Sequence, residues 1–240
     1  MKIDIYSSHK NVLGRDLKNK SAVVIDVLRS TTTLLTAFNN GLKRFLVVDS
    51  PIDAPEYKQD LNNDRVLMGG TEDHQFITGF DAGDILEDYR ASVVGGKELI
   101  YYNVDTSPAI RKGSAARHLF IGGFLNMHAL AQTLVDAGDD VAIICAGTNG
   151  NFSIEDGLAA GNLVQAIRDL GKRPDLSEYA FLLKNTYNTY KMDLLGAIQY
   201  SKTYQVLRPM GLEMDIKHAL TQDAYDFVPL LYDNWLTVLR

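Results

Sequence analysis

Short apolar runs rich in β-branched residues alternate along the chain with longer segments whose apolar residues recur at helical spacing. Short buried runs are typical of strands, and their alternation with helices predicts an α/β fold with a mixed, mainly parallel sheet and helices on both faces. The predicted strands span residues 2–6, 22–27, 45–48, 66–68, 98–102, 118–121 and 141–146. The predicted helices between them span residues 31–40, 54–62, 126–137 and 153–170.

The pattern changes after Pro174. Residues 178–220 have a helical pattern rich in tyrosine and leucine, with a break at Pro209-Met-Gly211, and residues 227–239 form an apolar tail. No internal repeat, low-complexity tract or flexible linker marks a domain boundary. We therefore expect one domain over residues 1–240, in three α/β/α layers, with a helical C-terminal part from about residue 175.

Composition excludes several classes of partner. A formal net charge of −6 leaves no basic surface for nucleic acid or an anionic membrane. No apolar run approaches the roughly 18 to 20 residues of a membrane span. The single cysteine, Cys145, excludes an internal disulfide, and the first six residues suggest a strand rather than a signal peptide. We expect a cytoplasmic protein with no nucleic-acid or membrane partner.

The first candidate site follows the strand at residues 22–27. Asp26, Arg29 and the hydroxyl run from Ser30 to Thr33 stand where this strand turns into a helix. Ligands gather at the carboxyl ends of strands, and a helix N-terminus attracts anions. Asp26 could hold a hard cation, while Arg29 and the hydroxyls could hold a phosphate or carboxylate. Serine and threonine are also ordinary N-cap residues and aspartate an ordinary turn residue, so both interpretations stand.

A second candidate is the acidic, glycine-rich loop at residues 68–84. It carries Glu72, Asp73, Asp81 and Asp84 together with His74, which could supply oxygen ligands to Mg²⁺ or Ca²⁺. The spacing is not that of an EF-hand. The alternative is a solvated acidic loop, because polar, glycine-rich connections are common.

The third candidate is the turn after the strand at residues 141–146. Ser153 and Asp156 have the spacing of a capping box, which accounts for both side chains. Glu155 falls in the first helical turn, where it could face a cation. Cys145 stands at the strand end like a nucleophile, but a cysteine phosphatase needs an arginine six positions later, where Asn151 stands. A small buried thiol is the better interpretation of Cys145.

Other mechanistic classes lack their residues. Leu28 stands where a haloacid-dehalogenase-type phosphatase needs a second aspartate, and the chain has no P-loop, dinucleotide fingerprint, His-Glu-x-x-His or Gly-x-Ser-x-Gly motif. The five histidines have no ligand spacing. Carboxylates, hydroxyls and one arginine at strand ends remain, and these suit Mg²⁺-assisted chemistry on a small phosphorylated anion.

Several motifs resemble one family over nearly the whole chain. They are Val24-Ile-Asp-Val-Leu-Arg-Ser-Thr-Thr-Thr33, Gly79-Phe-Asp-Ala-Gly83, Gly123-Phe-Leu-Asn126, Cys145-Ala-Gly147 with Phe152-Ser-Ile-Glu-Asp156 and Gly161, Gly211-Leu-Glu-Met-Asp-Ile216, and Val228-Pro229. Together they resemble the 2-phosphosulfolactate phosphatase (ComB) family. The resemblance implies a three-layer α/β fold of the family's own kind and Mg²⁺-dependent release of phosphate from 2-phosphosulfolactate, with bacterial relatives acting on other 2-phosphorylated hydroxy acids.

Three stretches depart from the family's pattern. Gly70-Thr-Glu-Asp73 stands in place of Gly-Glu-Arg, Val104-Asp-Thr-Ser107 in place of Thr-Asn-Gly-Thr, and Asp84-Ile-Leu86 in place of Asn-Ser-Pro. The changes remove donors for an anionic substrate and add like charge, each worth roughly 1 to 3 kcal/mol of binding. They leave the substrate preference open.

The hypothesis from the sequence is a Mg²⁺-dependent phosphomonoester hydrolase with a small phosphorylated anionic substrate. The candidate catalytic residues are Asp26, Arg29, Glu155 and Asp156. The candidate substrate-binding residues are Ser30, Thr31, Thr32, Asp105, Thr106, Ser107 and Gly147, and the candidate metal ligands are Asp26, Glu72, Asp81 and Glu155. The alternative is a non-catalytic protein that retains the anion pocket of a phosphatase. A homodimer is the expected assembly.

Overall fold

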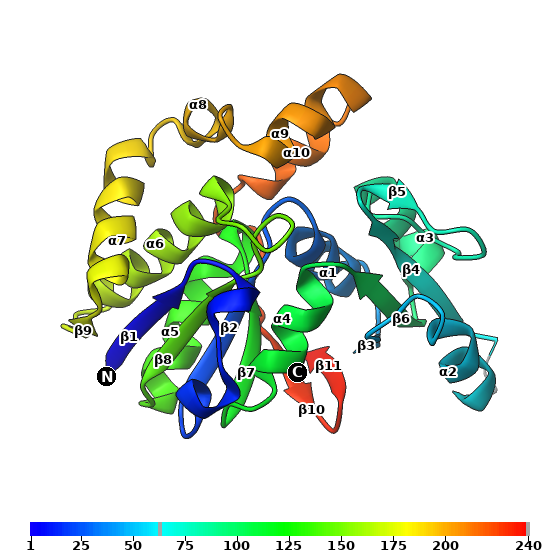
Figure 1. Ribbon diagram of the computed structural model, residues 1–240, viewed down its shortest axis with the longest axis horizontal. Helices are drawn as coiled ribbons and strands as arrows, with labels where there is room; N and C mark the ends of the chain where they lie inside the picture. Colours follow the sequence, from blue (N-terminus) through cyan, green and yellow to red (C-terminus); the bar gives the residue numbers. More distant parts are fainter. Residues whose placement is uncertain (62–63, 239–240) are drawn as a thin grey trace.

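A computed structural model describes residues 1–61 and 64–238 and joins the strands of this part of the chain into one mixed sheet (Figure 1). The strand order is β5-β4-β6-β3-β11-β10-β7-β2-β8-β1-β9. The bounds are β1 Lys2–Tyr6, β2 Ser21–Ile25, β3 Arg44–Val47, β4 Val66–Glu72, β5 Gln75–Phe76, β6 Glu98–Asn103, β7 His118–Gly122, β8 Val141–Cys145, β9 Asp175–Leu176, β10 Pro229–Tyr232 and β11 Trp235–Val238. The seven predicted strands are confirmed, with shifts of one or two residues at some ends and a longer β4.

Most neighbouring strands are parallel, as predicted. One parallel group is β7-β2-β8-β1-β9 and the other is β3-β6-β4. The hairpin β10–β11 lies between the groups and runs antiparallel to β7 on one side and to β3 on the other. The predicted α/β class is therefore confirmed, and the C-terminal hairpin joins the two parallel groups into one sheet (Figure 1).

Helices cover both faces of the sheet, because the side chains of its strands alternate between two apolar layers. The helix bounds are α1 Ser30–Asn39, α2 Ala54–Leu61, α3 Ala91–Val94, α4 Thr106–Gly113, α5 Met127–Ala137, α6 Ile154–Asp169, α7 Glu178–Tyr190, α8 Leu194–Ile198, α9 Lys202–Leu207 and α10 Glu213–Ala219. On β2, Val23 and Ile25 pack with α5, α6 and α7, whereas Ala22 and Val24 pack with α1 and α4. The four helices expected within residues 31–170 are confirmed, and residue 62 of the second lies outside the described residues.

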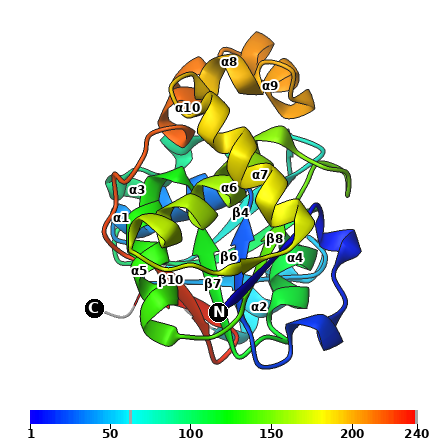
Figure 2. The same ribbon diagram turned by 90° about the vertical axis from the view of Figure 1, so that its left-hand side faces the viewer.

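The helical C-terminal part forms an arm over one end of the α/β body. Its pattern predicts helix from 178 to 220, and the structure divides this range into α7, α8, α9 and α10 (Figure 2). Two of the helices that begin within this range have side-chain N-caps. The Asp193 side chain accepts from the N–H of Gly196 at the start of α8, and the Ser201 side chain accepts from the N–H of Tyr204 at the start of α9. The predicted break at Pro209-Met-Gly211 is confirmed as a 3₁₀ turn, Arg208–Met210.

The apolar tail is the hairpin β10–β11, and residue 239 lies outside the described residues. Asp233 and Asn234 occupy its two-residue turn with φ of 47° and 65°. Aspartate and asparagine tolerate this left-handed region, and a turn with both central residues there matches the twist of paired strands. A hairpin signal was therefore present in the sequence within the tail.

The crossing of α6 and α7 depends on Gly161. A Cβ built on Gly161 would lie 2.2 Å from the carbonyl oxygen of Leu183, which belongs to the backbone of α7. Gly161→Ala is therefore expected to lower the free energy of unfolding by about 2 to 3 kcal/mol, because the two helices must move apart. Urea denaturation measures this change.

Gly157→Ala is the matched control, one turn earlier on the same helix. The nearest atoms to its Cβ belong to the ring of Phe152, which is 44% exposed and can turn away. Alanine also has the better helix propensity, by about 1 kcal/mol. An equal loss of stability in the two variants would contradict the role assigned to Gly161.

Candidate active site

The turn after β2 and the turns after β6 and β8 meet around one small polar cavity. Its lining includes Asp26, Arg29, Asp84, Asp105 and Gly147, and its volume is about 20 Å³. This is roughly the space that one water molecule needs, so a larger ligand enters only if the lining side chains move. Two larger hollows, of about 780 and 680 Å³, lie beside Phe227 and contain none of the predicted site residues.

The hydroxyl run after β2 closes its own turn. The Thr31 hydroxyl donates to the Asp26 carbonyl oxygen over 2.9 Å and accepts from the Asp26 N–H over 3.0 Å. The Thr32 hydroxyl donates to the Val27 carbonyl oxygen over 2.8 Å. These predicted substrate-binding hydroxyls therefore fix the backbone that carries Asp26 and Arg29.

Asp26 is buried among other acids. The Thr106 hydroxyl donates a hydrogen bond to its Oδ2 atom. Burial raises the pKa of Asp26 to about 8, the negative charges of Asp84, Asp105 and Glu155 act in the same direction, and the bond from Thr106 opposes the shift. The cavity therefore has a surplus of carboxylates at the point where the resemblance implies a cation.

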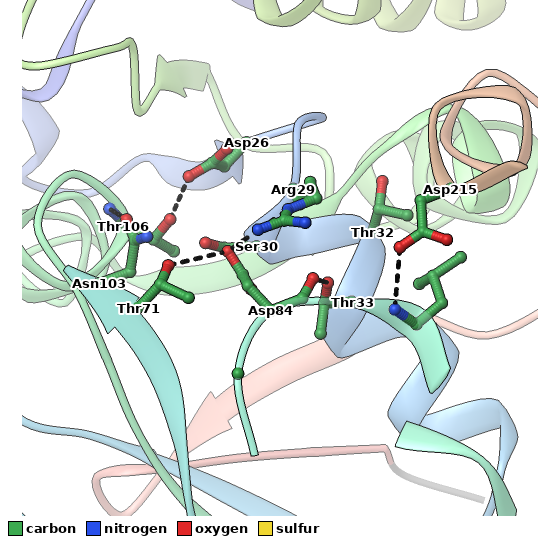
Figure 3. A network of polar contacts seen from close by, with 12 residues as sticks. Asp26, Arg29, Ser30, Thr32, Thr33, Thr71, Asp84, Asn103, Thr106 and Asp215 are labelled. Atoms are coloured by element: carbon green, nitrogen blue, oxygen red, sulfur yellow. Dashed lines mark hydrogen bonds and ion pairs between the residues drawn. The ribbon is translucent and has the colours of Figure 1, made fainter. Parts of the chain in front are cut away.

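Arg29 is the one arginine among the residues lining this cavity, and its guanidinium is incompletely paired. The side chain is buried, and its Nε and Nη1 atoms have no hydrogen-bond partner. The nearest acid is Asp84, whose Oδ2 atom lies 3.9 Å from Nε (Figure 3). Buried donors are almost always hydrogen-bonded in proteins, so two free donors beside a polar cavity indicate a site for an anion.

The turn after β6 is fixed by its own polar side chains. Asn103 Oδ1 accepts from the N–H groups of Asp105 and Thr106 over 3.0 and 3.1 Å, and Ser107 Oγ accepts from the Asn103 N–H over 3.0 Å. Of the predicted residues Asp105, Thr106 and Ser107, the first lines the cavity, the second contacts Asp26, and the third stabilises the turn.

Asp105 links this turn to the loop after β8. Its carboxylate accepts from the N–H groups of Asn149 and Gly150 over 2.6 and 2.8 Å. The His9 Nδ1 atom lies 3.6 Å from the same carboxylate and 2.9 Å from the carbonyl oxygen of Ala146. Three loops that are far apart in the sequence are thus held around the cavity.

The capping-box interpretation is half wrong. Ser153 caps α6 by accepting from the Asp156 N–H over 3.3 Å, but the Asp156 side chain does not return to Ser153. Its carboxylate accepts instead from the N–H of Val27 over 2.8 Å and from the N–H of Gly147 over 3.0 Å. Asp156 therefore joins the turns after β2 and β8, because two buried backbone donors need an acceptor there.

Asp156→Asn is expected to lower the free energy of unfolding by about 1 to 3 kcal/mol. An amide has a single acceptor oxygen, so one of the two buried N–H groups loses its partner and faces the amide NH₂. Asp169→Asn is the control, since Asp169 is exposed at the other end of α6 and bonds only to Gln165. Urea denaturation compares the two variants, and equal losses would contradict the role of Asp156.

Glu155 lies in the first turn of α6, as predicted, and is buried next to Asp156. Its Oε2 atom has no hydrogen-bond partner, and burial raises its pKa. Cys145 is also buried, in agreement with its interpretation as an inert thiol. Glu155 thus has an unpartnered carboxylate oxygen, and its negative charge acts on Asp26, although Glu155 is not among the residues that line the cavity.

The acidic loop at residues 68–84 contributes side chains to the cavity, but not the two that the sequence suggested as metal ligands. Glu72 is exposed at the end of β4, and Asp81 bonds to Lys58 Nζ and to the Met68 N–H, each over 2.9 Å. Neither lines the cavity; Asp73 and His74 do, from the tip of the β4–β5 hairpin. Burial lowers the pKa of His74, and the positive charge of Arg29 adds to the shift.

The carboxylate oxygens of the site suit a hard cation whose coordination is completed by a bound substrate. Within residues 1–61 and 64–238, no three His, Cys, Asp or Glu side chains are close enough together to enclose a metal. Mg²⁺ is commonly bound by one or two carboxylates, with waters and substrate phosphate completing its shell. Asp26 and the unpartnered oxygen of Glu155 fit that pattern, whereas a closed structural metal site would need more ligands.

Several site residues were not among the sequence candidates. Tyr101 on β6 donates to Asp84 Oδ1 over 2.5 Å, and Thr71 on β4 donates to Asp84 Oδ2 over 3.3 Å. Thr203 reaches the cavity from α9 in the C-terminal arm. Tyr101 and Thr203 lie within ordinary strand and helix patterns, so no local signal marks them.

Comparisons with known proteins agree with the sequence motifs. Residues 6–234 match the family described as 2-phosphosulpholactate phosphatase. A protein of Clostridium acetobutylicum named "Probable 2-phosphosulfolactate phosphatase" is 35% identical over 229 residues, which cover 95% of this chain and 97% of the relative. Proteins with the same name from Caldanaerobacter subterraneus subsp. tengcongensis and Clostridium beijerinckii are 33% and 31% identical, over 96% and 99% of this chain and 95% and 99% of the relatives.

The helices that the structure describes include none that is both long and apolar enough to cross a membrane. The longest is α6, of 16 residues.

Proposed function

Because this chain belongs to the 2-phosphosulfolactate phosphatase family, we propose that it hydrolyses the phosphomonoester of 2-phosphosulfolactate or of a related 2-phosphorylated hydroxy acid. The observation that carries the proposal is the buried guanidinium of Arg29, whose Nε and Nη1 donors are free beside a polar cavity. A phosphate group accepts such donors, and a guanidinium matches its geometry.

The residues of the cavity divide into binding and positioning roles. Arg29 would hold the phosphate, with the N-terminus of α1 behind it. Thr106 fixes the Asp26 carboxylate, and Asp156 fixes the two turns that carry Asp26 and Gly147. Water would attack phosphorus in line with the leaving oxygen, which departs with a proton as the free hydroxy acid, and inorganic phosphate remains.

We propose that Asp26 and Glu155 hold Mg²⁺. A bound divalent cation would polarise a phosphoryl oxygen and orient the attacking water. It would also offset the negative charges of Asp84, Asp105 and Glu155 that raise the pKa of Asp26. The surplus of buried carboxylate supports this assignment.

Hydrolysis of a panel of 2-phosphorylated hydroxy acids tests both proposals. Release of phosphate is expected for at least one member, with activity lost on chelation and restored by Mg²⁺. Turnover that a chelator leaves unchanged would contradict the metal, and inertness toward the whole panel with Mg²⁺ present would contradict the phosphatase. Phosphorylated acids with the phosphate on carbon 3 serve as the matched controls.

A non-catalytic anion-binding protein is the second candidate. The observation in its favour is that acids surround the cavity and its volume is about 20 Å³. This alternative predicts that a panel member raises the melting temperature without phosphate release.

A further inference from the structure

Asp84 and Arg29 form a buried pair that leaves the Nε and Nη1 donors of the arginine free. The Asp84 Oδ2 atom lies 3.9 Å from Arg29 Nε, and their side chains are 3% and 4% exposed. This distance is too long for a hydrogen bond but short enough for strong charge attraction away from water. Asp84 therefore offsets the charge of Arg29 without occupying its donors.

The position of the Asp84 carboxylate is fixed from two strands. Tyr101 on β6 donates to Oδ1 and Thr71 on β4 donates to Oδ2 (Figure 3). Burial raises the pKa of Tyr101 well above its ordinary value, so its hydroxyl keeps the proton that it donates. A carboxylate that accepts hydrogen bonds from two hydroxyls cannot easily swing away from the arginine.

The loop that carries Asp84 is also tied to the C-terminal arm. The Leu86 N–H donates to Asp215 Oδ2 on α10 over 3.0 Å, and the Thr33 hydroxyl donates to the Asp84 carbonyl oxygen over 3.2 Å. In Figure 3 the Asp84 carboxylate lies below Arg29, with Thr33 and Asp215 to its right. The backbone of the loop is therefore fixed at Asp84 itself and again two residues later.

We infer that Asp84 is a specificity-determining residue, which limits how tightly Arg29 binds an anion and penalises dianions more than monoanions. An anion that accepts from Arg29 Nε and Nη1 must come close to the Asp84 carboxylate, since that carboxylate is already 3.9 Å from Nε. The repulsion grows in proportion to the charge of the ligand. This inference depends on the proposed function only in taking phosphate as the anion that Arg29 binds.

The consequence for a phosphatase is weaker retention of its product. Inorganic phosphate near neutral pH carries between one and two negative charges and nothing else for the site to bind, so Asp84 weakens its binding directly. The phosphate group of a phosphorylated hydroxy acid meets the same repulsion, so binding of the whole substrate depends on its further groups, which other lining residues can contact.

Binding of inorganic anions to Asp84→Asn tests the inference. The substitution keeps the shape and leaves an oxygen to accept from Tyr101, but removes the charge. Titration calorimetry on chelator-treated protein is expected to show phosphate and sulfate binding at least tenfold tighter than in the wild type, about 1.4 kcal/mol, with a smaller gain for acetate. Asp84→Ser, which also removes the charge, gives the same comparison should the asparagine variant not fold.

Asp81→Asn is the matched control, because it removes one charge from the same loop outside the cavity. Its carboxylate bonds to Lys58 and to the Met68 N–H, so no gain in anion affinity is expected. Equal, weaker or undetectable phosphate binding by the Asp84 variants would overturn the inference, as would an equal gain for acetate and sulfate. Failure of the hydrolysis panel would leave these binding results unchanged, so the two proposals can fail separately.

Discussion

Asp26→Asn is expected to lower kcat by about 10³-fold or more, and at the same time to stabilise the metal-free fold at pH 8. The loss of activity follows from the proposed roles, because an amide cannot replace the negative charge of a metal ligand or of a buried acid facing the phosphate. Initial rates on the best substrate of the panel, at saturating substrate and Mg²⁺, measure this loss.

The gain in stability follows from the pKa of Asp26, which is raised from 3.8 to about 8 in the folded protein. At a pH between these values the folded state binds a proton that the unfolded state does not, so the stability that this proton contributes is full below pH 4 and lost as pH rises toward 8. A neutral asparagine avoids the loss. We expect a gain of about 2 to 4 kcal/mol at pH 8 and little change near pH 4.

Urea denaturation in the presence of a chelator, at several pH values, measures this change. Asp16→Asn is the control, because Asp16 lies half-buried on the 3₁₀ turn Gly14–Leu17, outside the cavity lining. An inactive Asp26 variant that is also less stable at pH 8 would indicate that the charge contributes to the fold rather than to the chemistry. Unchanged kcat would contradict the role of Asp26 outright.

The fold could be predicted from the sequence because its elements have strong local patterns. The run at residues 22–27 is fully apolar up to Asp26, as expected for a strand buried on both faces, and β2 is flanked by β7 and β8. The C-terminal hairpin was missed although its turn, Asp233-Asn234, carries a local signal. Its position between β3 and β7 depends on contacts with strands about 110 to 190 residues earlier in the chain, and the helical pattern before it gives no indication of a return to the sheet.

The candidate site was predictable where a motif is continuous in the sequence. Two predicted strands are followed by Asp26, Arg29 and Glu155. In the structure Asp26 and Arg29 line the cavity, and the charge of Glu155 contributes to the raised pKa of Asp26. Asp156 was assigned to a capping box because its real acceptor role, toward Val27 and Gly147, depends on contacts between two turns. Tyr101 could not be identified, since a buried tyrosine on a strand is ordinary until its hydroxyl is known to meet Asp84.

Arg29→Met is the variant with the second large effect, an expected fall in kcat/KM of about 10³-fold with inorganic phosphate binding abolished. The side chain keeps its apolar volume, but the site loses its guanidinium, and Asp84 is left as a buried carboxylate without a cation. Arg29→Lys keeps the charge without the fork of donors. It is expected to lose more than tenfold but less than methionine does, because an ammonium cannot replace both Nε and Nη1.

Arg111→Met serves as the control for loss of a paired arginine. Arg111 bonds to Asp49 at the surface over 2.9 Å and takes no part in the cavity. Unchanged kcat/KM is expected for it, together with a stability change below about 1 kcal/mol. Phosphate binding that persists in Arg29→Met would contradict the anion site. A fall of the same size in the lysine and methionine variants would show that the reaction requires the two donors Nε and Nη1 of Arg29, and not its charge alone.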